Sequence, residues 1–394
     1  MARFQYGGQA LIEGVLMRGR NALAVALRHP DGSIVWATER LDMGLRARRA
    51  LKLPLVRGLV LLYDTLVTGT RWLVRSATLQ ALEAEGGTPG PTATGGITTA
   101  LFGLAVMPAG PILCAAASDD GSSAPTAPSG SPSGAQSGLG KGYNVAVGGM
   151  LLVALVAGIG FFFLLPLALA QATVGRVDQG LGLQFSEGLI RVVMFVGYLL
   201  LIGRAADVRR TFQYHGAEHM SIHTLEAGDP LTVESARKYP TAHPRCGTEF
   251  LVVVLIVSII AFSFLPKLSP VGLIASRVLL VPVIAAISYE LLQFGAKRRN
   301  RRFVRWLWAP GIWVQAITTR QPTDDMIEVA IVSLEHALQA DGNEIPAGSS
   351  DFSARPLNPE TDFEAPVTTD PVAVPAAANG SEGAVKVNAE GVDS

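Results

Sequence analysis

The 394-residue sequence contains few cysteines and few charged residues. Its two cysteines, Cys114 and Cys246, are too few for a fold held by a disulfide framework. Charged residues make up 16% of the chain and apolar residues 49%, whereas a typical soluble protein has roughly 25% charged residues. This balance excludes a disordered chain, a coiled coil and a collagen-like fibre, and it indicates a membrane protein. Residues 1–20 contain charges and no long apolar run, so we expect no cleavable signal peptide.

The net charge of zero hides an uneven distribution along the chain. From residue 341 to the end there are ten acidic and two basic residues, a net charge of −8, in a sequence rich in proline, alanine and glycine. Such a segment cannot bury enough apolar surface to fold, so residues 341–394 are predicted to form a disordered acidic tail. The preceding 340 residues carry the balancing net charge of +8.

The first region, residues 1–85, is expected to be a cytosolic β unit followed by an amphipathic helix. Two β-prone runs, residues 22–27 and 33–38, flank the sequence His-Pro-Asp-Gly, which favours a tight turn. Residues 58–74 are largely apolar but contain charged residues, a pattern typical of a helix that lies in the membrane interface.

Residues 86–142 are predicted to be flexible linkers on either side of an apolar segment, residues 97–117. The linkers are rich in glycine, serine, proline and threonine and have no hydrophobic periodicity. Two prolines and a glycine interrupt the apolar segment, so a membrane crossing, a re-entrant segment and a surface-lying segment all remain open for it.

Four later segments are apolar over nearly the ~20 residues that a helix needs to cross a bilayer. They form two predicted transmembrane pairs, residues 143–203 and 250–294, and they should be helical because a backbone in lipid must satisfy its own hydrogen bonds. The sequence therefore predicts an α-helical multi-pass membrane protein with about four transmembrane helices and a small cytosolic α+β portion. Arg191 and Arg277 are expected at the interface, which leaves few polar groups deep in the spans and makes a transporter the least favoured function.

Lysine and arginine residues set the expected orientation. They are concentrated in residues 204–249, between the two pairs, and in residues 295–340, after the last span. The positive-inside rule then places both segments, and both termini, in the cytoplasm. Three tryptophans lie beside the second basic cluster, so we expect it to contact the lipid bilayer and its anionic headgroups rather than nucleic acid. Residues 324–339 are predicted to form an amphipathic helix.

The cytosolic segment 204–249 holds four of the six histidines. His215, His219 and His223 are each four residues apart, which places their rings on one face of a helix. With Glu218, the first two form an H-x-x-E-H pattern, in which two imidazoles bind a metal beside a carboxylate. A polar helix face without a metal explains the same spacing, so both alternatives stay open.

A histidine and a cysteine follow about twenty residues later. His243 and Cys246 form a His-x-x-Cys sequence, a spacing at which both side chains can reach one zinc ion. Thiolate and imidazole ligands suit zinc better than magnesium or calcium. Together with the helix, this predicts a zinc site whose ligands are His215, His219, His243 and Cys246.

Five motifs run through the chain in order, at residues 7–19, 214–223, 243–248, 288–290 and 310–320. Together they resemble the YqhQ-like family, bacterial multi-pass membrane proteins of unknown function that are often labelled predicted metal-dependent enzymes. The resemblance implies a bacterial cytoplasmic (inner) membrane protein with a metal site. This chain has Met220 where the family usually has lysine and Glu249 where it usually has serine, and neither is a predicted ligand.

These features predict a zinc-dependent membrane enzyme, a hydrolase whose site lies at the cytosolic membrane face. Glu218 is the predicted catalytic residue, which would activate a water polarised by the metal. His223, Glu13 and Arg245 are possible additional members of the site. A catalytic zinc needs an open position, so four protein ligands would instead indicate a structural zinc in a non-catalytic membrane scaffold, which is the main alternative.

Overall fold

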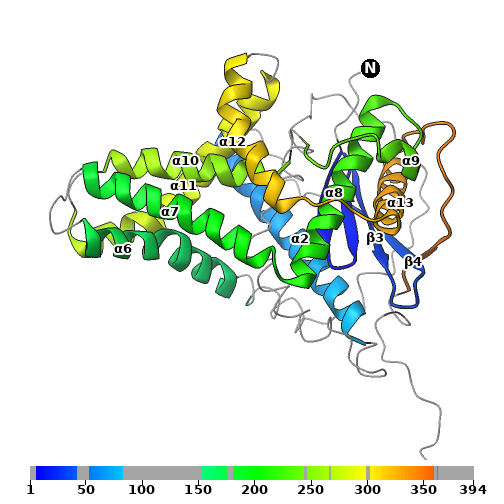
Figure 1. Ribbon diagram of the computed structural model, residues 1–394, viewed down its shortest axis with the longest axis horizontal. Coiled ribbons are helices and arrows are strands. Elements are labelled where there is room, and N and C mark those ends of the chain that lie inside the picture. Colours follow the sequence, from blue (N-terminus) through cyan, green and yellow to red (C-terminus); the bar gives the residue numbers. More distant parts are fainter. Residues whose placement is uncertain are drawn as a thin grey trace, which may run out of the picture.

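The computed structural model describes residues 6–41, 53–82, 149, 152–174, 181–243, 246–265, 268–298, 302–358 and 362. These residues form a bundle of long helices joined to a part that contains a β-sheet (Figure 1). The whole predicted linker region, residues 86–142 with the apolar segment 97–117, lies outside the described residues, as does the chain from residue 363 onward.

The sheet has five strands in the order of the chain. The strands are β1 (Gly7–Leu11), β2 (Gly14–Arg18), β3 (Ala22–Arg28), β4 (Ile34–Arg40) and β5 (Ala354–Pro356). The first four pair antiparallel with their neighbours, and β5 pairs parallel with β4. The predicted hairpin between residues 22–27 and 33–38 is confirmed as β3 and β4. β1 and β2 were not predicted, because their glycines are unfavourable for strands.

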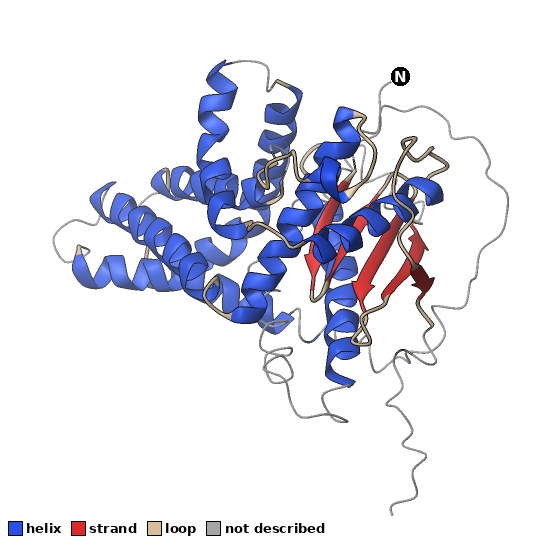
Figure 2. Cartoon of the chain, turned by 45° about the vertical axis from the view of Figure 1, so that its right-hand side comes forward, coloured by secondary structure: helices blue, strands red, loops and turns tan. Residues whose placement is uncertain are grey.

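Helices cover both faces of this sheet (Figure 2). On one face lie α8 (Ala206–Ala227) and α13 (Asp324–Ala340), which pack on Val15, Met17, Ala24 and other side chains of the same face. On the other face lies α2 (Val56–Leu82), packed on the alternate strand residues such as Leu16 and Val25. Side chains alternate between the faces of a strand, and because both faces are covered, β1 and β2 are buried along their whole length.

The segment after α13 belongs to this part and is not disordered. The Asp341 carboxylate accepts hydrogen bonds from the Tyr6 hydroxyl at 3.0 Å and from the backbone N–H groups of Arg20 at 2.7 Å and Asn21 at 2.8 Å. Further on, residues 354–356 form β5. The prediction of an acidic tail from residue 341 is therefore wrong for residues 341–358, since composition does not register pairing with a distant strand edge.

The helical bundle contains three helices long and apolar enough to cross a membrane, counted over the described residues. They are Leu152–Thr173, Gly182–Ile202 and Val271–Gly295. The second and third lie within α7 (Leu181–Ile202) and α11 (Pro270–Lys297). The first segment of the second predicted pair, residues 250–294, is the shorter apolar helix α10 (Thr248–Ser263). Its 16 residues extend about 24 Å against a hydrocarbon core of about 30 Å.

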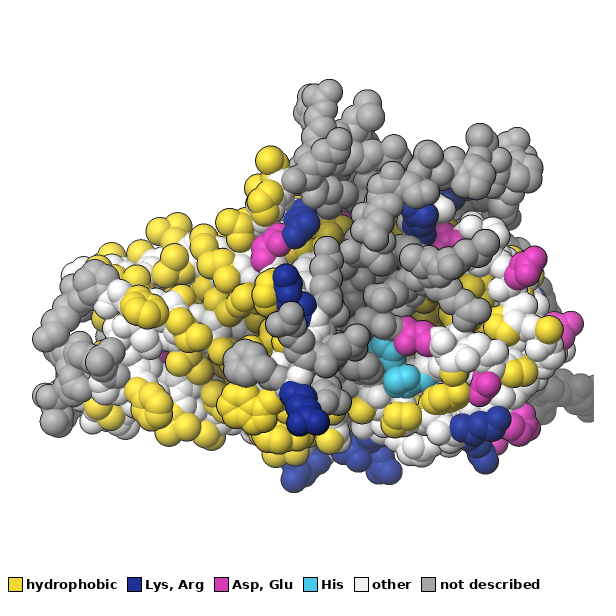
Figure 3. Space-filling view, turned by 90° about the horizontal axis from the view of Figure 1, so that it is seen from above, with side chains coloured by type: hydrophobic (Ala, Val, Ile, Leu, Met, Phe, Trp, Pro, Cys, Tyr) yellow, Lys and Arg dark blue, Asp and Glu magenta, His cyan; other side chains and the backbone are white. Residues whose placement is uncertain are grey.

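The surface of the bundle is typical of a membrane protein. Leu201, Leu279 and Phe185 are each about 70% exposed on its helices. Viewed from above, one half of the molecule is mainly hydrophobic, the half with the sheet carries acidic side chains, and lysine and arginine side chains lie near the border (Figure 3). Near this border lies α12 (Arg302–Thr318), with Trp306 and Trp313 more than 70% exposed. Aromatic and basic side chains at such a border match the water–lipid interface.

The first crossing helix is interrupted at its middle. Residues Gly160–Leu164 form a π-helical turn, η3, which leads into α6 (Leu165–Thr173). Pro166 lies two residues after this turn and has no N–H, so the carbonyl of Phe162, four residues earlier, lacks its α-helical donor. Arg191 of α7 donates its Nε–H to that carbonyl at 3.0 Å.

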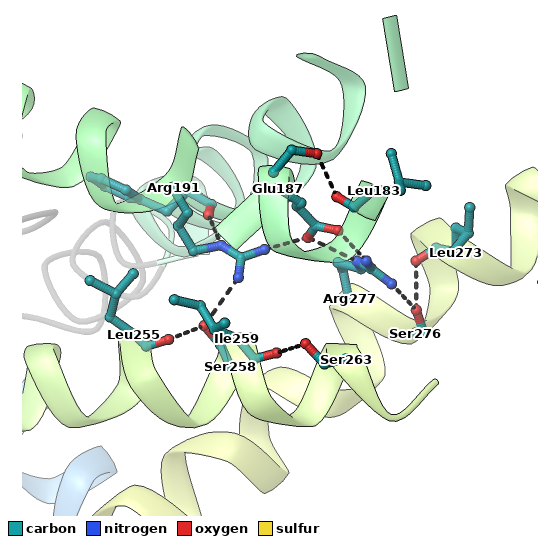
Figure 4. A network of polar contacts seen from close by, with 12 residues as sticks. Leu183, Glu187, Arg191, Leu255, Ser258, Ile259, Ser263, Leu273, Ser276 and Arg277 are labelled. Atoms are coloured by element: carbon teal, nitrogen blue, oxygen red, sulfur yellow. Dashed lines mark hydrogen bonds and ion pairs between the residues drawn. The ribbon is translucent and has the colours of Figure 1, made fainter. Parts of the chain in front are cut away.

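Arg191 is part of an ion cluster buried among α7, α10 and α11 (Figure 4). Glu187 accepts hydrogen bonds from both Arg191 and Arg277, and all three residues are at most 2% exposed. The second guanidinium nitrogen of Arg191 donates to Ser258 at 3.1 Å. The prediction that the two arginines lie at the interface is therefore wrong, because they pair with a carboxylate of the bundle instead of reaching solvent.

A second ion pair joins α2 to the bundle. Arg57, at the start of α2, pairs with Glu290 of α11, and the backbone N–H of Leu55 donates to the same carboxylate at 3.0 Å. Gly58 then lies against Tyr289, so close that a Cβ there would lie 2.8 Å from the tyrosine ring. These contacts connect the sheet-covering helix to the last crossing helix.

Candidate metal centre

Helix α8 carries the histidine-rich motif, as its spacing predicts. The helix begins after a short turn that follows α7. It ends at Gly228, which adopts a left-handed conformation with φ of 81°. One side of α8 packs on the sheet through Tyr214, Ala217 and Met220. The histidines lie on the side that approaches the loop before α10 and the end of α12.

Three predicted ligands come together in the interior. His215, His219 and Cys246 each offer one ligand atom, and these atoms lie within 4.8 Å of one another. The Nε2 atom of His215 is 3.2 Å from the Cys246 Sγ, and the two imidazole centroids are 4.4 Å apart. All three side chains are at most 2% exposed. We call these three residues the inner group.

Backbone carbonyls hold both imidazoles of the inner group. The Nδ1 atom of His215 is 3.0 Å from the Thr318 carbonyl oxygen, and that of His219 is 2.5 Å from the Thr241 carbonyl oxygen. A carbonyl only accepts, so each Nδ1 carries the proton and each Nε2 has the lone pair. The Nε2 of His219 is buried without a hydrogen-bond partner among the described residues. A backbone partner on the second nitrogen is the usual arrangement of a metal-binding histidine.

Gly216 of α8 allows this helix to lie close to the end of α12. Gly216 lies against the segment that follows Thr318, and a Cβ at this glycine would lie 2.1 Å from the Arg320 carbonyl oxygen. The Arg320 N–H in turn donates to the Phe212 carbonyl at 2.9 Å. The close approach brings the Thr318 carbonyl to His215.

Burial sets the protonation of the inner group. It lowers the pKa of His215 to about 4 and that of His219 well below its ordinary value, with the neighbouring histidines adding to the second shift. Both imidazoles are therefore neutral at pH 7, the form that binds metals. Burial and the nearby Glu218 raise the pKa of the Cys246 thiol above its ordinary range. The thiol thus keeps its proton unless a cation replaces it.

Glu218 lies on the same helix, facing the sheet. Its side chain is 1% exposed and packs against Gly8 of β1, where a Cβ would lie 2.7 Å from the Glu218 Cγ. Burial raises its pKa from 4.5 to about 8, although a hydrogen bond from the Gly8 backbone opposes the shift. Its Oε2 has no hydrogen-bond partner among the described residues. Glu218 therefore holds a proton at pH 7 beside the inner group.

The fourth predicted ligand, His243, is grouped with other residues. Its ligand atom lies within 4.8 Å of those of His223 and Glu226. The Nε2 of His243 is 3.5 Å from the Glu226 Oε2, and its ring centroid is 4.4 Å from that of His223. The centroids of His219 and His243 are 5.6 Å apart. We call His223, Glu226 and His243 the outer group.

A further predicted site residue, Glu13, lies outside both groups. The carboxylate of Glu13, in the turn between β1 and β2, pairs with Arg210 and accepts a hydrogen bond from the Tyr214 hydroxyl at 3.2 Å. Glu13 has a φ of 53°, so the turn aims this side chain at the start of α8. It holds the hairpin to the helix. Arg245 lies outside the described residues.

Sequence reasoning missed two residues that shape the site. Gln315 of α12 accepts from the His243 N–H at 2.9 Å and donates to the His243 carbonyl at 3.0 Å, so it fixes the loop that carries this histidine. Glu226 was not singled out, although it follows His223 by three residues, a spacing that puts both on one helix face. Gln315 lies in the last of the five motifs, which was the only signal for it.

The donor set of the inner group fits a zinc-like ion. Two neutral imidazoles and a thiol supply the nitrogen and sulfur ligands that zinc prefers. All three are fully buried, and the Nε2 of His219 has no other partner among the described residues. Three protein donors are also the number found in catalytic zinc sites, which keep a fourth position open. Four protein donors, the number that the sequence predicts, are typical of structural sites.

Comparison with known proteins gives a family but no activity. A family model described as "Protein of unknown function (DUF1385)" matches residues 53–340. The chain is 28% identical over 335 residues to "Uncharacterized protein YqhQ" of Bacillus subtilis (strain 168), an alignment that covers 85% of this chain and 92% of the relative. No solved structure matches.

Proposed function

This chain belongs to the DUF1385 family of proteins of unknown function, and from that premise we propose that it is a metal-dependent membrane hydrolase. The metal is zinc, held by His215, His219 and Cys246. The protein lies in a bacterial cytoplasmic membrane with both termini in the cytoplasm, and its site faces the cytoplasm where the bundle meets the sheet. The resemblance to YqhQ-like proteins, confirmed by the comparisons, is consistent with this proposal but names no reaction.

One observation carries the proposal. In the inner group, backbone carbonyls fix both imidazoles so that their lone-pair nitrogens lie beside the Cys246 sulfur, and the Nε2 of His219 has no partner among the described residues. An unpartnered polar atom at full burial is costly, so this arrangement favours a bound ion as its partner. When bound, zinc supplies Lewis-acid polarisation of an ester, amide or phosphoester and of the attacking water.

Glu218 has the properties of the proton-transferring group in such a site. Its pKa of about 8 is close to the working pH, where a group both gives and takes a proton efficiently. It lies near enough to Cys246 for its charge to raise the pKa of that thiol. Gly8 holds the carboxyl side chain in place by close packing. We assign Glu218 the role of general acid and base.

The rival function is a scaffold in which zinc only holds α8 to the loop before α10. The full burial of the inner group and of Glu218 favours this reading, because a substrate must reach a catalytic ion. In the scaffold, Glu218 is a fourth ligand and closes the site. The two functions therefore assign different roles to one carboxylate, and that difference can be tested.

The membrane surface is the proposed partner of the basic border. Exposed Trp306 and Trp313 lie on α12, after the basic segment that follows α11. Anionic headgroups attract such juxtamembrane bases, at about 1 kcal/mol per side chain near the surface. We do not assign nucleic acid as a ligand, because exposed aromatic side chains beside basic ones are typical of contact with lipid headgroups.

The test is metal content by mass spectrometry on the full chain purified in detergent without chelator. About one tightly bound zinc per chain is expected, and it should be lost in both His219→Ala and Cys246→Ala. Glu218→Gln decides between the two functions. The hydrolase predicts that this variant keeps its zinc and loses turnover of a responsive ester, amide or phosphoester, found by screening the wild type. The scaffold predicts that it loses zinc.

The matched control is Glu234→Gln, which changes an exposed carboxylate on the short helix α9 (Val233–Ala236). It should change neither metal content nor turnover. A wild-type chain that is folded but contains no zinc, and that takes up none on titration, would overturn both functions.

A further inference from the structure

The outer group has the composition of a metal site in its own right. His223 and Glu226 are three residues apart on α8, one turn beyond His219, and His243 comes from the loop between α9 and α10. The three ligand atoms lie within 4.8 Å of one another. Three residues from two separate segments thus converge on one point.

Hydrogen bonds with neighbouring residues fix the positions of two members of the outer group. The Nε2 of His223 donates to the Ala242 carbonyl at 3.0 Å, which leaves the lone pair on Nδ1. Gln315, which is fully buried, forms two hydrogen bonds with the backbone of His243 and so fixes its position. A ring nitrogen held by a backbone carbonyl, as in His223, is typical of histidines that bind metals.

The outer group differs from the inner group in ligand chemistry and in access. It offers two imidazoles and a carboxylate, whereas the inner group offers two imidazoles and a thiol. The Glu226 side chain is 35% exposed and His223 is partly exposed, while His243 is buried. One side of the outer group therefore faces solvent. On the face seen from above, histidine side chains reach the surface beside an acidic one (Figure 3).

We propose that His223, Glu226 and His243 form a second site for a divalent first-row transition metal. Two histidines and one carboxylate are the ligands of many catalytic zinc sites and of non-haem iron(II) sites, both of which leave positions open. The rings of His215, His219, His243 and His223 form a continuous row, with centroid distances of 4.4, 5.6 and 4.4 Å. The two sites are therefore adjacent.

The second site stands on the geometry of the outer group alone, whereas its joint use with an inner ion rests on the proposed function. With an ion in each group, the buried site would lie behind a solvent-facing one, which answers how a substrate could reach the metal chemistry.

Cobalt(II) distinguishes the two sites because only one has a thiol. The full chain, purified in detergent and freed of metal, is titrated with cobalt(II) while its absorption is recorded. We expect two equivalents to bind, one with a thiolate-to-cobalt charge-transfer band in the near ultraviolet and one without it. Glu226→Gln and His243→Ala should each lose the equivalent without the band, and Cys246→Ser should lose the band.

Glu226→Gln changes a partly exposed side chain, so the variant should fold, and Glu234→Gln is its control. If the wild type binds one equivalent with the band, the second site is wrong and the inner site stands. If it binds one equivalent without the band, the second site stands and the inner site is wrong. Two equivalents that remain in Glu226→Gln also overturn the second site, and no binding overturns both.

Discussion

Arg191 donates its Nε–H to the carbonyl oxygen of Phe162 at 3.0 Å, which is the carbonyl that Pro166 cannot serve. The same guanidinium bonds Ser258 and Glu187, so one side chain connects the broken helix to α10 and to the ion cluster of the bundle. A charged group within a bilayer is costly unless it is paired. The arginine is therefore held by contacts that also repair a defect in the neighbouring helix.

This relationship predicts a coupling between Arg191 and Pro166. Arg191→Lys should destabilise the chain because an ammonium group cannot reach all three partners in the same geometry. Pro166→Ala restores a backbone N–H four residues after Phe162, so the loss caused by Arg191→Lys should be smaller in that background. We expect a coupling energy of about 0.5–1.5 kcal/mol, measured by a double-mutant cycle of unfolding in detergent. Strictly additive effects would contradict the shared carbonyl.

The ion cluster predicts a large loss of stability when the charge of Glu187 is removed. Glu187 is the acceptor for both buried arginines, so Glu187→Gln leaves two guanidinium groups without their counter-ion. The free energy of unfolding should fall by about 3–5 kcal/mol, the usual cost of breaking a buried ion pair. Thermal unfolding in detergent measures it, with the exposed Glu234→Gln as control. A loss below about 1 kcal/mol would show that lipid or water compensates the arginines.

Glu218 predicts a dependence of stability on pH in the metal-free chain. Burial raises its pKa from 4.5 to about 8, so the folded state prefers the protonated form. The stability linked to that proton is present below pH 4.5 and is lost as the pH rises towards 8. The Glu218→Gln side chain cannot ionise. The free energy of unfolding of this variant should therefore exceed that of the wild type by near zero at pH 4.5 and by a few kcal/mol at pH 8. Thermal unfolding across this range tests it, and a constant difference would sink the assignment.

The close packing of Gly8 on Glu218 predicts that the sheet determines the position of this carboxyl group. A Cβ at this position would lie 2.7 Å from the Glu218 Cγ and 2.8 Å from the Leu16 carbonyl oxygen. Gly8→Ala should therefore displace Glu218 and cost about 1–3 kcal/mol of stability. Gly158→Ala is the matched control, because nothing lies within 4 Å of a Cβ there. If Gly8→Ala matches the wild type in stability and in the pH profile of Glu218, the packing is not what holds the carboxyl group.

The sequence predicts those helices and strands whose patterns lie within a short stretch of chain. The spacing of His215, His219 and His223 is a helical signal, and α8 has it. The turn His-Pro-Asp-Gly predicts the β3–β4 hairpin, which pairs as expected. The long apolar runs predict the crossing helices, three of which are long enough among the described residues. In each case the pattern lies within a few turns or strands of chain.

The missed features depend on residues that are far apart in sequence. Glu187 and Arg277 are 90 residues apart, and nothing local indicates that they pair. The i, i+4 spacing of Glu187 and Arg191 was the available signal. The His-x-x-Cys spacing allows His243 and Cys246 to share an ion, but Gln315, 72 residues from His243, fixes that loop beside His223 instead.

The place of β5 determines where the chain can be shortened. The matched family region covers residues 53–340, whereas the first four strands lie before it and β5 lies after it. A recombinant fragment cut to those limits would lose the whole sheet and leave the apolar faces of α2, α8 and α13 uncovered. Cutting only after residue 340 would expose the unpaired edge of β4, which invites aggregation. The smallest fragment fit for crystallisation or spectroscopy therefore retains the residues on both sides, from about 6 to 362, because the Asp362 carboxylate binds Arg355 of β5.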